Sequence, residues 1–400
     1  MTNIAKPGAG LALDNALLSD IATSVALREG PFGVARFFRA VLHHEGATLR
    51  TLAQEVGLPI PVASAIRREL EKRGYLSRGG GVHLTDKGRA FATDVLNLSV
   101  TPPAHSVTAG DVGAPDPALV RRLQDLLADA PHIRVELDQA PCTPETALRR
   151  AALMHRAGAL EGRSNLLLGD DDSLSLAIPL YLAHLGRVSP VGNITVLELD
   201  PGRIAFLREK TAQIGAEVSI IPHDLRDPLP AELKGRFDVF QTDPPYTIEG
   251  ARLFLTRAAE ALRPGPGSLG FLSYAQRAAA DQIVLQRVIQ ALGFSVSTIW
   301  RGFNCYEGAS ILGSIGQMIE LEGLFVDAPG QPQRYCGALY TADLSSRPRG
   351  YRCRSCGRRL ILGERGAPST IEALKSSGCP SCGEKAFSRW KPGGSRRKRR

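Results

Sequence analysis

Beyond about residue 118, short apolar runs of strand length alternate with longer segments of helical periodicity. The strand-like runs span residues 165–169, 194–200, 217–224, 237–243, 267–274 and 294–303. The helical segments between them span 175–186, 203–215, 251–263 and 281–293. Several of these helical segments end at glycine, a residue that commonly terminates helices. The alternation predicts an α/β domain built on a doubly wound, mostly parallel sheet.

Residues 34–96 carry a different pattern. Three amphipathic helical segments precede a short hairpin with three glycines at its turn, and Thr85 then caps a further helix. This order and spacing resemble a winged helix-turn-helix domain. The third helix carries cations suited to phosphate, interrupted by acids that can pair with them: Arg67, Arg68, Glu69, Glu71, Lys72 and Arg73. DNA binding and a packing or dimerisation role both remain open, because fold does not fix function.

Composition shifts mark the remaining boundaries. Residues 101–118 are rich in Pro, Gly and Ala and indicate a linker. The predicted organisation is a winged-helix-like domain (1–100), this linker, a catalytic domain (119–344), a zinc ribbon (345–388) and a basic, disordered tail (389–400). With 43% hydrophobic residues among 400, the chain has ample material for two or three cores.

Four of the seven cysteines form two Cys-x-x-Cys pairs with 22 residues between the pairs. Each pair is followed by a glycine. This spacing is typical of a tetrahedral zinc site with four thiolate ligands, Cys353, Cys356, Cys379 and Cys382. Because four protein ligands close the coordination sphere, we expect Zn²⁺ to have a structural role and to stabilise a segment with few apolar residues.

The net charge of +9 is concentrated at the end of the chain, where residues 385–400 carry eight cations and no acid. The rest of the protein is therefore nearly neutral. The tail has the composition of a disordered segment that contacts nucleic acid weakly or binds nothing specific. The sequence contains no apolar stretch of membrane-spanning length and no signal-peptide pattern at its start, which favours a cytoplasmic protein without membrane contact.

Three consecutive acids, Asp170, Asp171 and Asp172, follow Gly169 at the end of the first predicted strand. Nucleotide-binding α/β domains usually have a glycine-rich turn at this position, where the backbone approaches an anionic group. Adjacent carboxylates instead raise one another's pKa and need cations or water to compensate them. We therefore expect this turn to receive a positively charged ligand.

Acids also end the next three strands. Glu198 is placed to accept hydrogen bonds from ribose hydroxyls, and Asp224 is placed to bind an adenine amino group. Asp243 begins the segment Asp-Pro-Pro-Tyr, whose prolines stiffen the strand exit, so that Asp243 and Tyr246 are held at the crevice. Together these residues predict a site for a nucleoside-derived cofactor.

The Asp-Pro-Pro-Tyr segment resembles the motif of amino-group methyltransferases, which alkylate nitrogen with a sulfonium donor. A carboxylate must then orient the amine and take its proton; Asp243 is the first candidate for that role, followed by Asp172 and Asp171. Several segments in order, 138–160, LLLGDDD, LELD, HDLRDPLP, TDPPYT and RGFNCY, resemble the branched-chain polyamine synthases, or N4-bis(aminopropyl)spermidine synthases. The resemblance covers roughly residues 135–310; the zinc ribbon and the tail lie outside it.

The resemblance implies a Rossmann-like, methyltransferase-type fold with an N-terminal winged-helix domain. It implies transfer of aminopropyl groups from decarboxylated S-adenosylmethionine to an internal amine of a polyamine such as spermidine, with release of methylthioadenosine. It also implies substrate-pocket roles for Pro244, Tyr246, Phe303, Asn304 and Tyr306. An aspartate-lined site fits this donor, because the carboxylate of ordinary S-adenosylmethionine would be repelled and the decarboxylated form is purely cationic.

Two other functions remain open from the residues. One is an S-adenosylmethionine-dependent N-methyltransferase acting on nucleic acid or protein, suggested by the Asp-Pro-Pro-Tyr segment, the helical N-terminal region and the basic tail. The other is a transcription regulator that uses the sheet domain to sense polyamines or nucleotides. The unusual turn at residues 169–172 and the nearly neutral body argue against the first. The nucleophile-orienting motif argues against the second.

Overall fold

The computed structural model describes residues 15–98, 112–186, 193–307, 315–323, 333–340, 350–362 and 371–390. The chain divides into two compact units. The first comprises residues 1–133 and 140–337, and the second comprises residues 134–139 and 338–400. Most of the predicted linker, at 101–111, and the basic tail from residue 391 lie outside the described residues.

The N-terminal part of the first unit is a small helical domain with its own core. Its elements are α1 (Ala16–Ser24), α2 (Gly30–His43), α3 (Leu49–Glu55), α4 (Ile60–Lys72), β1 (Leu76–Arg78), β2 (Val82–Leu84), α5 (Asp86–Ala90) and a π-helical turn at Phe91–Val95. Apolar residues of α2 at helical spacing, Val34, Phe37, Phe38 and Val41, are buried. The Thr85 side chain accepts a hydrogen bond from the Gly88 N–H, as expected of a cap.

A seven-stranded sheet forms the centre of the catalytic domain, with strand order β5-β4-β3-β6-β7-β9-β8. Its strands are β3 (Asn165–Leu168), β4 (Ile194–Glu198), β5 (Val218–Pro222), β6 (Val239–Thr242), β7 (Ser268–Ala275), β8 (Phe294–Cys305) and β9 (Ile315–Gly323). All six strands expected from the sequence are present. β9 was not predicted; it pairs antiparallel with both β7 and β8 and makes the sheet mixed.

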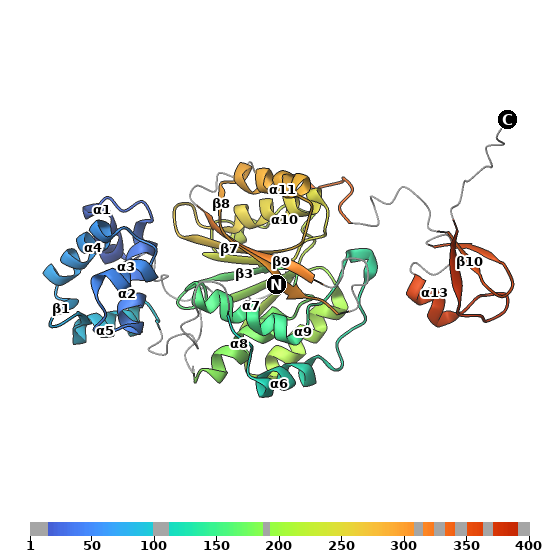
Figure 1. The fold of residues 1–400 in the computed structure, drawn as a ribbon, viewed down its shortest axis with the longest axis horizontal. Coiled ribbons are helices and arrows are strands. Elements are labelled where there is room, and N and C mark those ends of the chain that lie inside the picture. The colour runs from blue at the N-terminus through green and yellow to red at the C-terminus, as the bar shows by residue number, and fades with distance from the viewer. Residues whose placement is uncertain are drawn as a thin grey trace. The chain divides into compact units, whose positions relative to one another are not determined.

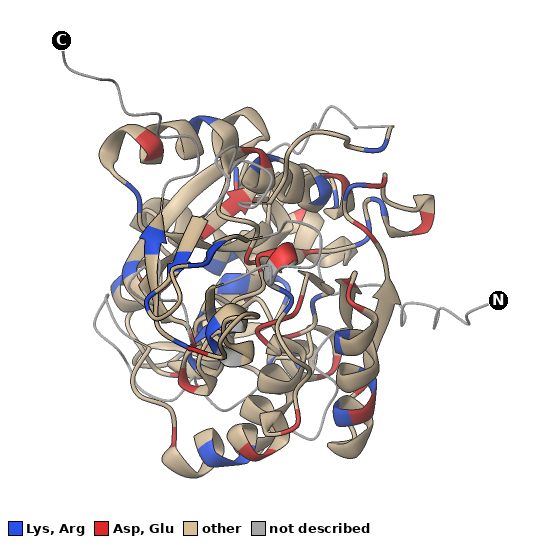
Figure 2. Cartoon of the chain, turned by 90° about the vertical axis from the view of Figure 1, so that its right-hand side faces the viewer, with Lys and Arg blue, Asp and Glu red and all other residues tan. Residues whose placement is uncertain are grey.

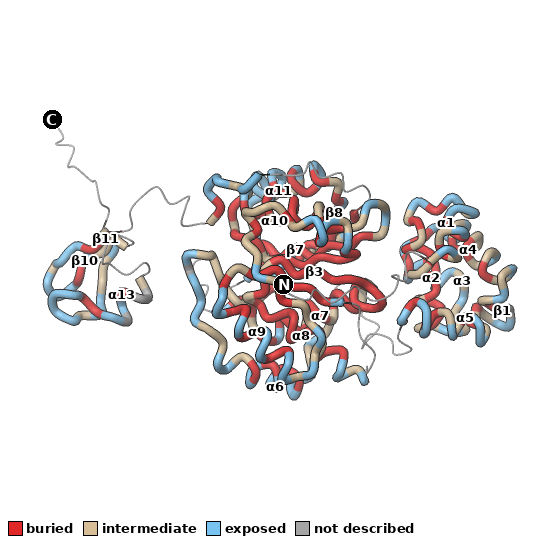
Figure 3. Tube along the Cα trace, turned by 180° about the vertical axis from the view of Figure 1, so that it is seen from behind, coloured by how far each residue is buried: buried red, intermediate tan, exposed pale blue. Residues whose placement is uncertain are grey.

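Helices cover both faces of this sheet (Figure 1). They are α6 (Pro117–Leu127), α7 (Pro144–Arg156), α8 (Leu174–His184) and α9 (Pro201–Gln213) on one face, and α10 (Ile248–Ala261) and α11 (Ala279–Ala291) on the other. Each face has its own buried apolar cluster. The central strands are buried along their length between these layers, as Figure 3 shows in red. The carboxyl ends of β3, β4 and β6 therefore open at one edge of the sheet.

The second unit contains a three-stranded antiparallel sheet of order β11-β10-β12. Its elements are β10 (Gly350–Cys353), β11 (Arg359–Ile361), α13 (Ile371–Ser377) and β12 (Phe387–Trp390). Within the described residues of the whole chain, no helix has both the length and the apolar character that a membrane span requires. In Figure 2, Lys and Arg are scattered among Asp and Glu over the described chain, consistent with the nearly neutral body expected from the sequence.

Candidate active site

The turn after β3 directs the first aspartate of the triplet inward. Gly169 has φ +76°, a conformation that favours glycine, and it turns the chain towards α8. Asp170 is only 2% exposed. Its carboxylate accepts hydrogen bonds from the N–H groups of Leu174 at 2.7 Å and Ser175 at 3.2 Å. Asp170 therefore caps α8, and its predicted role in binding the cofactor stays a prediction.

The next two aspartates contact the segment that leads into α7. Oδ2 of Asp171 accepts a hydrogen bond from the Ala140 N–H at 3.0 Å, and Oδ1 of Asp172 accepts one from the Cys142 N–H at 2.6 Å. Asp172 is 4% exposed, whereas Asp171 is only partly buried. Among the described residues, Oδ1 of Asp171 has no protein partner, so this oxygen remains available to a ligand.

A buried arginine on α7 connects the acids that end β3 and β6. Arg150 is fully buried and forms ion pairs with Asp172 and, at 3.0 Å, with Asp243. Its Nε donates to Oδ1 of Asn304 at 2.9 Å. Oδ2 of Asp243 also accepts from the Tyr306 hydroxyl at 2.7 Å. We call the group Arg150, Asp172, Asp243, Asn304 and Tyr306 the Arg150 cluster.

The Arg150 cluster contains two carboxylates for one guanidinium, and its electrostatics reflect this excess of acid. Burial raises the pKa of Asp243 to about 7, with the charge of Asp172 acting in the same direction against Arg150. Burial and the charges of Asp172 and Asp243 raise the pKa of Asp171 well above its usual value. Burial alone would lower the pKa of Arg150, but its acidic neighbours raise it above the ordinary value. The cluster would thus gain stability from a bound cation.

Aromatic side chains flank the cluster. The ring of Tyr246 contacts Tyr274 and Tyr306 edge-on, with centroid separations of 5.6 and 6.2 Å. The backbone carbonyl of Tyr246 accepts a hydrogen bond from Arg277. Pro244, the residue after Asp243, is buried. The predicted motif residues Asp243, Pro244 and Tyr246 therefore lie together at the end of β6.

The predicted pocket residues of segment 303–306 differ in their contacts with the Arg150 cluster. Asn304 is fully buried and donates to the Ser273 hydroxyl at 3.1 Å and to the Gln317 carbonyl at 2.9 Å. Phe303 is 3% exposed and its ring stacks under the Arg149 guanidinium at 4.4 Å. Among the predicted residues of the segment, Asn304 and Tyr306 therefore contact the Arg150 cluster directly, whereas Phe303 packs beside it.

The acids at the ends of β4 and β5, Glu198 and Asp224, differ in their hydrogen-bond partners. Glu198 uses Oε2 to accept from the Asp170 N–H at 2.9 Å and Oε1 to accept from the N–H groups of Leu199 and Asp200 at 2.8 and 2.9 Å. Glu198 thus ties the end of β4 to the turn after β3. This contact places Glu198 beside the triplet, and its predicted role in binding the ribose stays a prediction.

Asp224 follows β5 and is held by two arginines. Its Oδ2 accepts from Arg226 at 2.7 Å and from Arg334 at 2.8 Å. Burial acts to raise the pKa of Asp224, but these hydrogen bonds outweigh it and lower the pKa to about 2. Its carboxylate is therefore already compensated by protein cations, which the sequence did not reveal.

The four cysteines of the second unit come together. The Sγ atoms of Cys353 and Cys382 are 3.5 Å apart, those of Cys356 and Cys379 are 3.6 Å apart, and all four lie within 4.8 Å of one another. A tetrahedral site with zinc–sulfur bonds of about 2.3 Å has edges of about 3.8 Å. The donor set and its dimensions therefore fit Zn²⁺.

Sequence comparison identifies the catalytic domain. Residues 118–321 match the model of the branched-chain polyamine synthase A C-terminal domain. The chain belongs to the branched-chain polyamine synthase family. The resemblance inferred from the Gly-Asp-Asp-Asp and Asp-Pro-Pro-Tyr segments is thereby confirmed, and the matched region contains the Arg150 cluster in full.

Relatives extend this family assignment in two ways. An uncharacterised protein of Methanocaldococcus jannaschii is 32% identical over 380 residues, which cover 93% of this chain and 92% of the relative. The N(4)-bis(aminopropyl)spermidine synthase of Thermococcus kodakarensis is 33% identical over 258 residues, covering 62% of this chain and 70% of that enzyme. The first similarity thus extends over nearly the whole chain, including the region outside the synthase match.

A solved family member has the same fold. The crystal structure of the branched-chain polyamine synthase from Thermus thermophilus, in complex with N4-aminopropylspermidine and 5'-methylthioadenosine, aligns with a TM-score of 0.51 at 24% identity. The alignment covers 82% of this chain and 98% of that enzyme. The Rossmann-like α/β fold with a mixed sheet agrees with the methyltransferase-type architecture expected from the sequence.

Proposed function

We propose that this protein transfers aminopropyl groups from decarboxylated S-adenosylmethionine to an internal amine of a polyamine such as spermidine. The observation that carries the proposal is the Arg150 cluster, which joins the acids at the ends of β3 and β6 beside an aromatic wall. Family membership and the name of the T. kodakarensis relative support the same reaction. Methylthioadenosine would be the second product.

In this reaction the lone pair of the amine nitrogen attacks the propyl carbon bonded to the sulfonium. The carbon–nitrogen bond forms as the carbon–sulfur bond breaks, and the bonding pair returns to sulfur to give a neutral thioether. The nitrogen must lose one proton. Asp243 suits the base, because its Oδ2 is fixed by Arg150 and Tyr306 while Oδ1 has no hydrogen-bond partner among the described residues.

The same residues explain a preference for the decarboxylated donor. Asp171, Asp172 and Asp243 supply up to three negative charges, and Arg150 offsets one of them. One unit-charge contact at 4 Å is worth about 4 kcal/mol at an effective dielectric near 20, before desolvation. A donor carrying a carboxylate would be repelled, whereas ammonium and sulfonium groups would be attracted. In this proposal Glu198 would accept hydrogen bonds from the ribose hydroxyls in addition to those from its backbone partners.

The deciding experiment incubates the full chain with spermidine and either donor and measures the polyamines by mass spectrometry. We expect a gain of one or two aminopropyl units with decarboxylated S-adenosylmethionine only. A gain of methyl groups from ordinary S-adenosylmethionine would instead establish the N-methyltransferase function. If the protein is folded and neither donor is consumed, the proposal is wrong.

We further propose that Cys353, Cys356, Cys379 and Cys382 hold a structural Zn²⁺, as the dimensions of the cluster suggest. The ion would supply folding free energy to the second unit. Elemental analysis should give one zinc per chain, reduced by Cys379→Ser. The test is independent of catalysis: chelation should increase proteolysis within residues 350–390. Full protection without zinc would contradict the proposal.

The helical domain is proposed to be a winged-helix-type module that packs or dimerises. Three of the four cations of α4 and its C-cap are paired with acids of the helix, Arg67 with Glu71 and both Lys72 and the C-cap Arg73 with Glu69. These pairs leave less charge for phosphate, which favours the packing role over DNA binding. Light scattering of the full chain should give a dimer mass, and a monomer would contradict this role.

Deletion of residues 391–400 should abolish any weak nucleic-acid retention in a gel-shift assay.

A further inference from the structure

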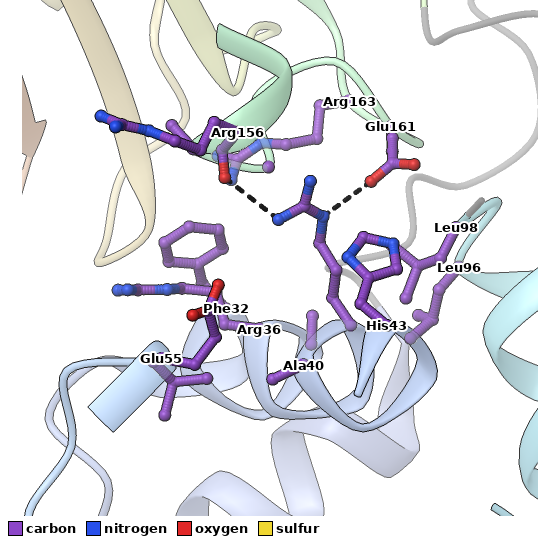
Figure 4. Close-up of a pocket in the computed structure, with 15 residues that line it drawn as sticks. Phe32, Arg36, Ala40, His43, Glu55, Leu96, Leu98, Arg156, Glu161 and Arg163 are labelled. Atoms are coloured by element: carbon purple, nitrogen blue, oxygen red, sulfur yellow. Dashed lines mark hydrogen bonds and ion pairs between the residues drawn. The ribbon is translucent and has the colours of Figure 1, made fainter. Parts of the chain in front are cut away.

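A polar cavity lies away from the Arg150 cluster, where α2 of the helical domain meets the C-terminal end of α7. Its volume is about 90 Å³. One ordered water needs roughly 10–15 Å³ on this measure, so the cavity can hold a small polyatomic ligand. Figure 4 shows residues that surround it, including Phe32, Arg36, Arg156 and Arg163, and Arg39 also lines it.

Cations outnumber acids around this cavity. Four arginines and two glutamates line it. Arg39 and Glu161 pair with each other at 2.8 Å, and Arg39 also donates to the carbonyl oxygens of His155 and Arg156. Arg156 lies 3.5 Å from Glu320 and stacks on Trp300. The remaining acid, Glu55, has a side chain that is 55% exposed and lies at the rim.

Arg163 is the least compensated of these cations. It is 3% exposed, and its guanidinium stacks on the Phe32 ring at 4.5 Å. Nη2 donates to the carbonyl oxygens of Asp238 and Gly267. Nε and Nη1 are buried and have no hydrogen-bond partner. Buried guanidinium N–H groups without acceptors are costly, so this arrangement indicates an absent acceptor.

Arg36 supports the same interpretation from the helical domain. It lies on α2 across the cavity from Arg163. Burial lowers the pKa of Arg36 against the charges of Glu322 and Glu29, and it lowers the pKa of Arg163 to about 10 against the charge of Asp238. Both side chains therefore stay charged at neutral pH, and a cation or an apolar ligand would leave the buried N–H groups of Arg163 without acceptors. An anion with several acceptor oxygens would satisfy them.

We propose that this cavity binds one small tetrahedral oxyanion of the size of phosphate, held by Arg163 of the catalytic domain and Arg36 of the helical domain. The bound ion would accept hydrogen bonds from Nε and Nη1 of Arg163 and would join the two domains. The site uses no residue of the Arg150 cluster. It is therefore independent of the proposed aminopropyl transfer.

The test is calorimetric titration of inorganic phosphate into the full chain, with sulfate as a second probe and a phosphate monoester as a third. We expect one saturable site per chain for phosphate and sulfate. The monoester should bind at least about tenfold more weakly, since the cavity is small. A monoester that binds as tightly as phosphate would identify an open, organic-phosphate site and overturn the size assignment.

Matched variants locate the site. Arg163→Gln and Arg36→Gln should each weaken phosphate binding about tenfold or more, because each removes a charge-assisted contact. Arg122→Gln, an exposed arginine on α6, and deletion of residues 391–400 should leave the affinity unchanged. Asp243→Asn should also bind phosphate normally, which separates this site from the active site.

Two outcomes would overturn the proposal: the absence of saturable binding, or equal affinity in the wild type and both arginine variants. Arg163→Gln also removes two hydrogen bonds to backbone carbonyls and could unfold the domain. If circular dichroism shows that loss, Arg36→Gln decides alone, because within the described part of the chain the Arg36 side chain makes no hydrogen bond to a backbone carbonyl.

Discussion

The Arg150 cluster and the site around Asp224 both place carboxylates against arginine at strand ends, yet they have opposite electrostatics. In the cluster, one buried arginine serves Asp172 and Asp243, and burial raises the pKa of Asp243 to about 7. At the end of β5, two half-exposed arginines serve Asp224, and their hydrogen bonds outweigh burial to lower its pKa to about 2. The number of cations per acid, more than the position at a strand end, separates a carboxylate with a raised pKa from one with a lowered pKa.

The largest effect should come from Arg150. Replacing it with Gln leaves two buried carboxylates without their cation, which typically costs about 3–5 kcal/mol of unfolding free energy. The rate of aminopropyl transfer by this variant should also fall. Chemical denaturation of Arg150→Gln against Arg226→Gln tests the comparison directly. The second variant should lose about 1 kcal/mol or less, because Arg334 still pairs with Asp224 and the site is exposed. Equal losses would remove the distinction between the two sites.

Asp243→Asn should lower kcat by about 10² to 10⁴, the usual contribution of a positioned base, with a smaller change in donor binding. Asp224→Asn provides the control. Because its carboxylate is engaged by arginines, it should change kcat little, and any loss should appear in the KM of the donor. Steady-state kinetics with decarboxylated S-adenosylmethionine separate the effect on kcat from the effect on KM. Comparable kcat losses in both variants would argue against a base at position 243.

The pH profile should follow Asp243. The base must be ionised, and its pKa is about 7, so kcat/KM should fall about tenfold per unit as the pH drops below 7. The same raised pKa means that the folded state binds this proton more tightly than the unfolded chain. Ionisation of Asp243 therefore destabilises the fold as the pH rises from about 4 to 7. A profile that is flat from pH 5 to 8 would contradict this assignment.

The smallest expected effect is the contribution of Asp224 to the stability of the fold at low pH. Its folded pKa of about 2 lies below the ordinary value, so the ionised form stabilises the fold above pH 4. This contribution should be lost as the pH falls from about 4 to 2. Thermal unfolding of the wild type and Asp224→Asn should differ at pH 6 and converge near pH 2. A difference that persists unchanged at pH 2 would show that Asp224 acts through packing instead.

Alternating periodicity predicted six of the seven strands because buried strands and amphipathic helices leave local patterns. β9 was not predicted, although Ile319 and Leu321 alternate along it with Glu320 and Glu322. The position of Asp243 and Tyr246 at a strand end followed from the same local pattern. The site acids could therefore be named before their partners were known.

Long-range pairing could not be predicted in this way. Arg150 lies on a helix where an arginine usually indicates a solvated face, and only the fold brings it to Asp243, 93 residues away. Its signal was its place within the segment that resembles the family. Arg334 lies 110 residues from Asp224, and no local pattern relates them. The inward turn of Asp170 depends on Ser173, which adopts φ +55° although it is not glycine.

Helix α7 connects the helical domain to the active site, and this connection affects any shortened form of the protein. Arg150 projects from it into the active site, while its last carbonyl groups, at His155 and Arg156, accept hydrogen bonds from Arg39 of the helical domain. A shortened chain that begins after residue 100 would lose this cation at the helix terminus, where charge of that sign is favourable. The helix would then fray towards the turn that holds Arg150. Isolated preparations of the synthase domain would underestimate the activity of the intact enzyme even if they fold.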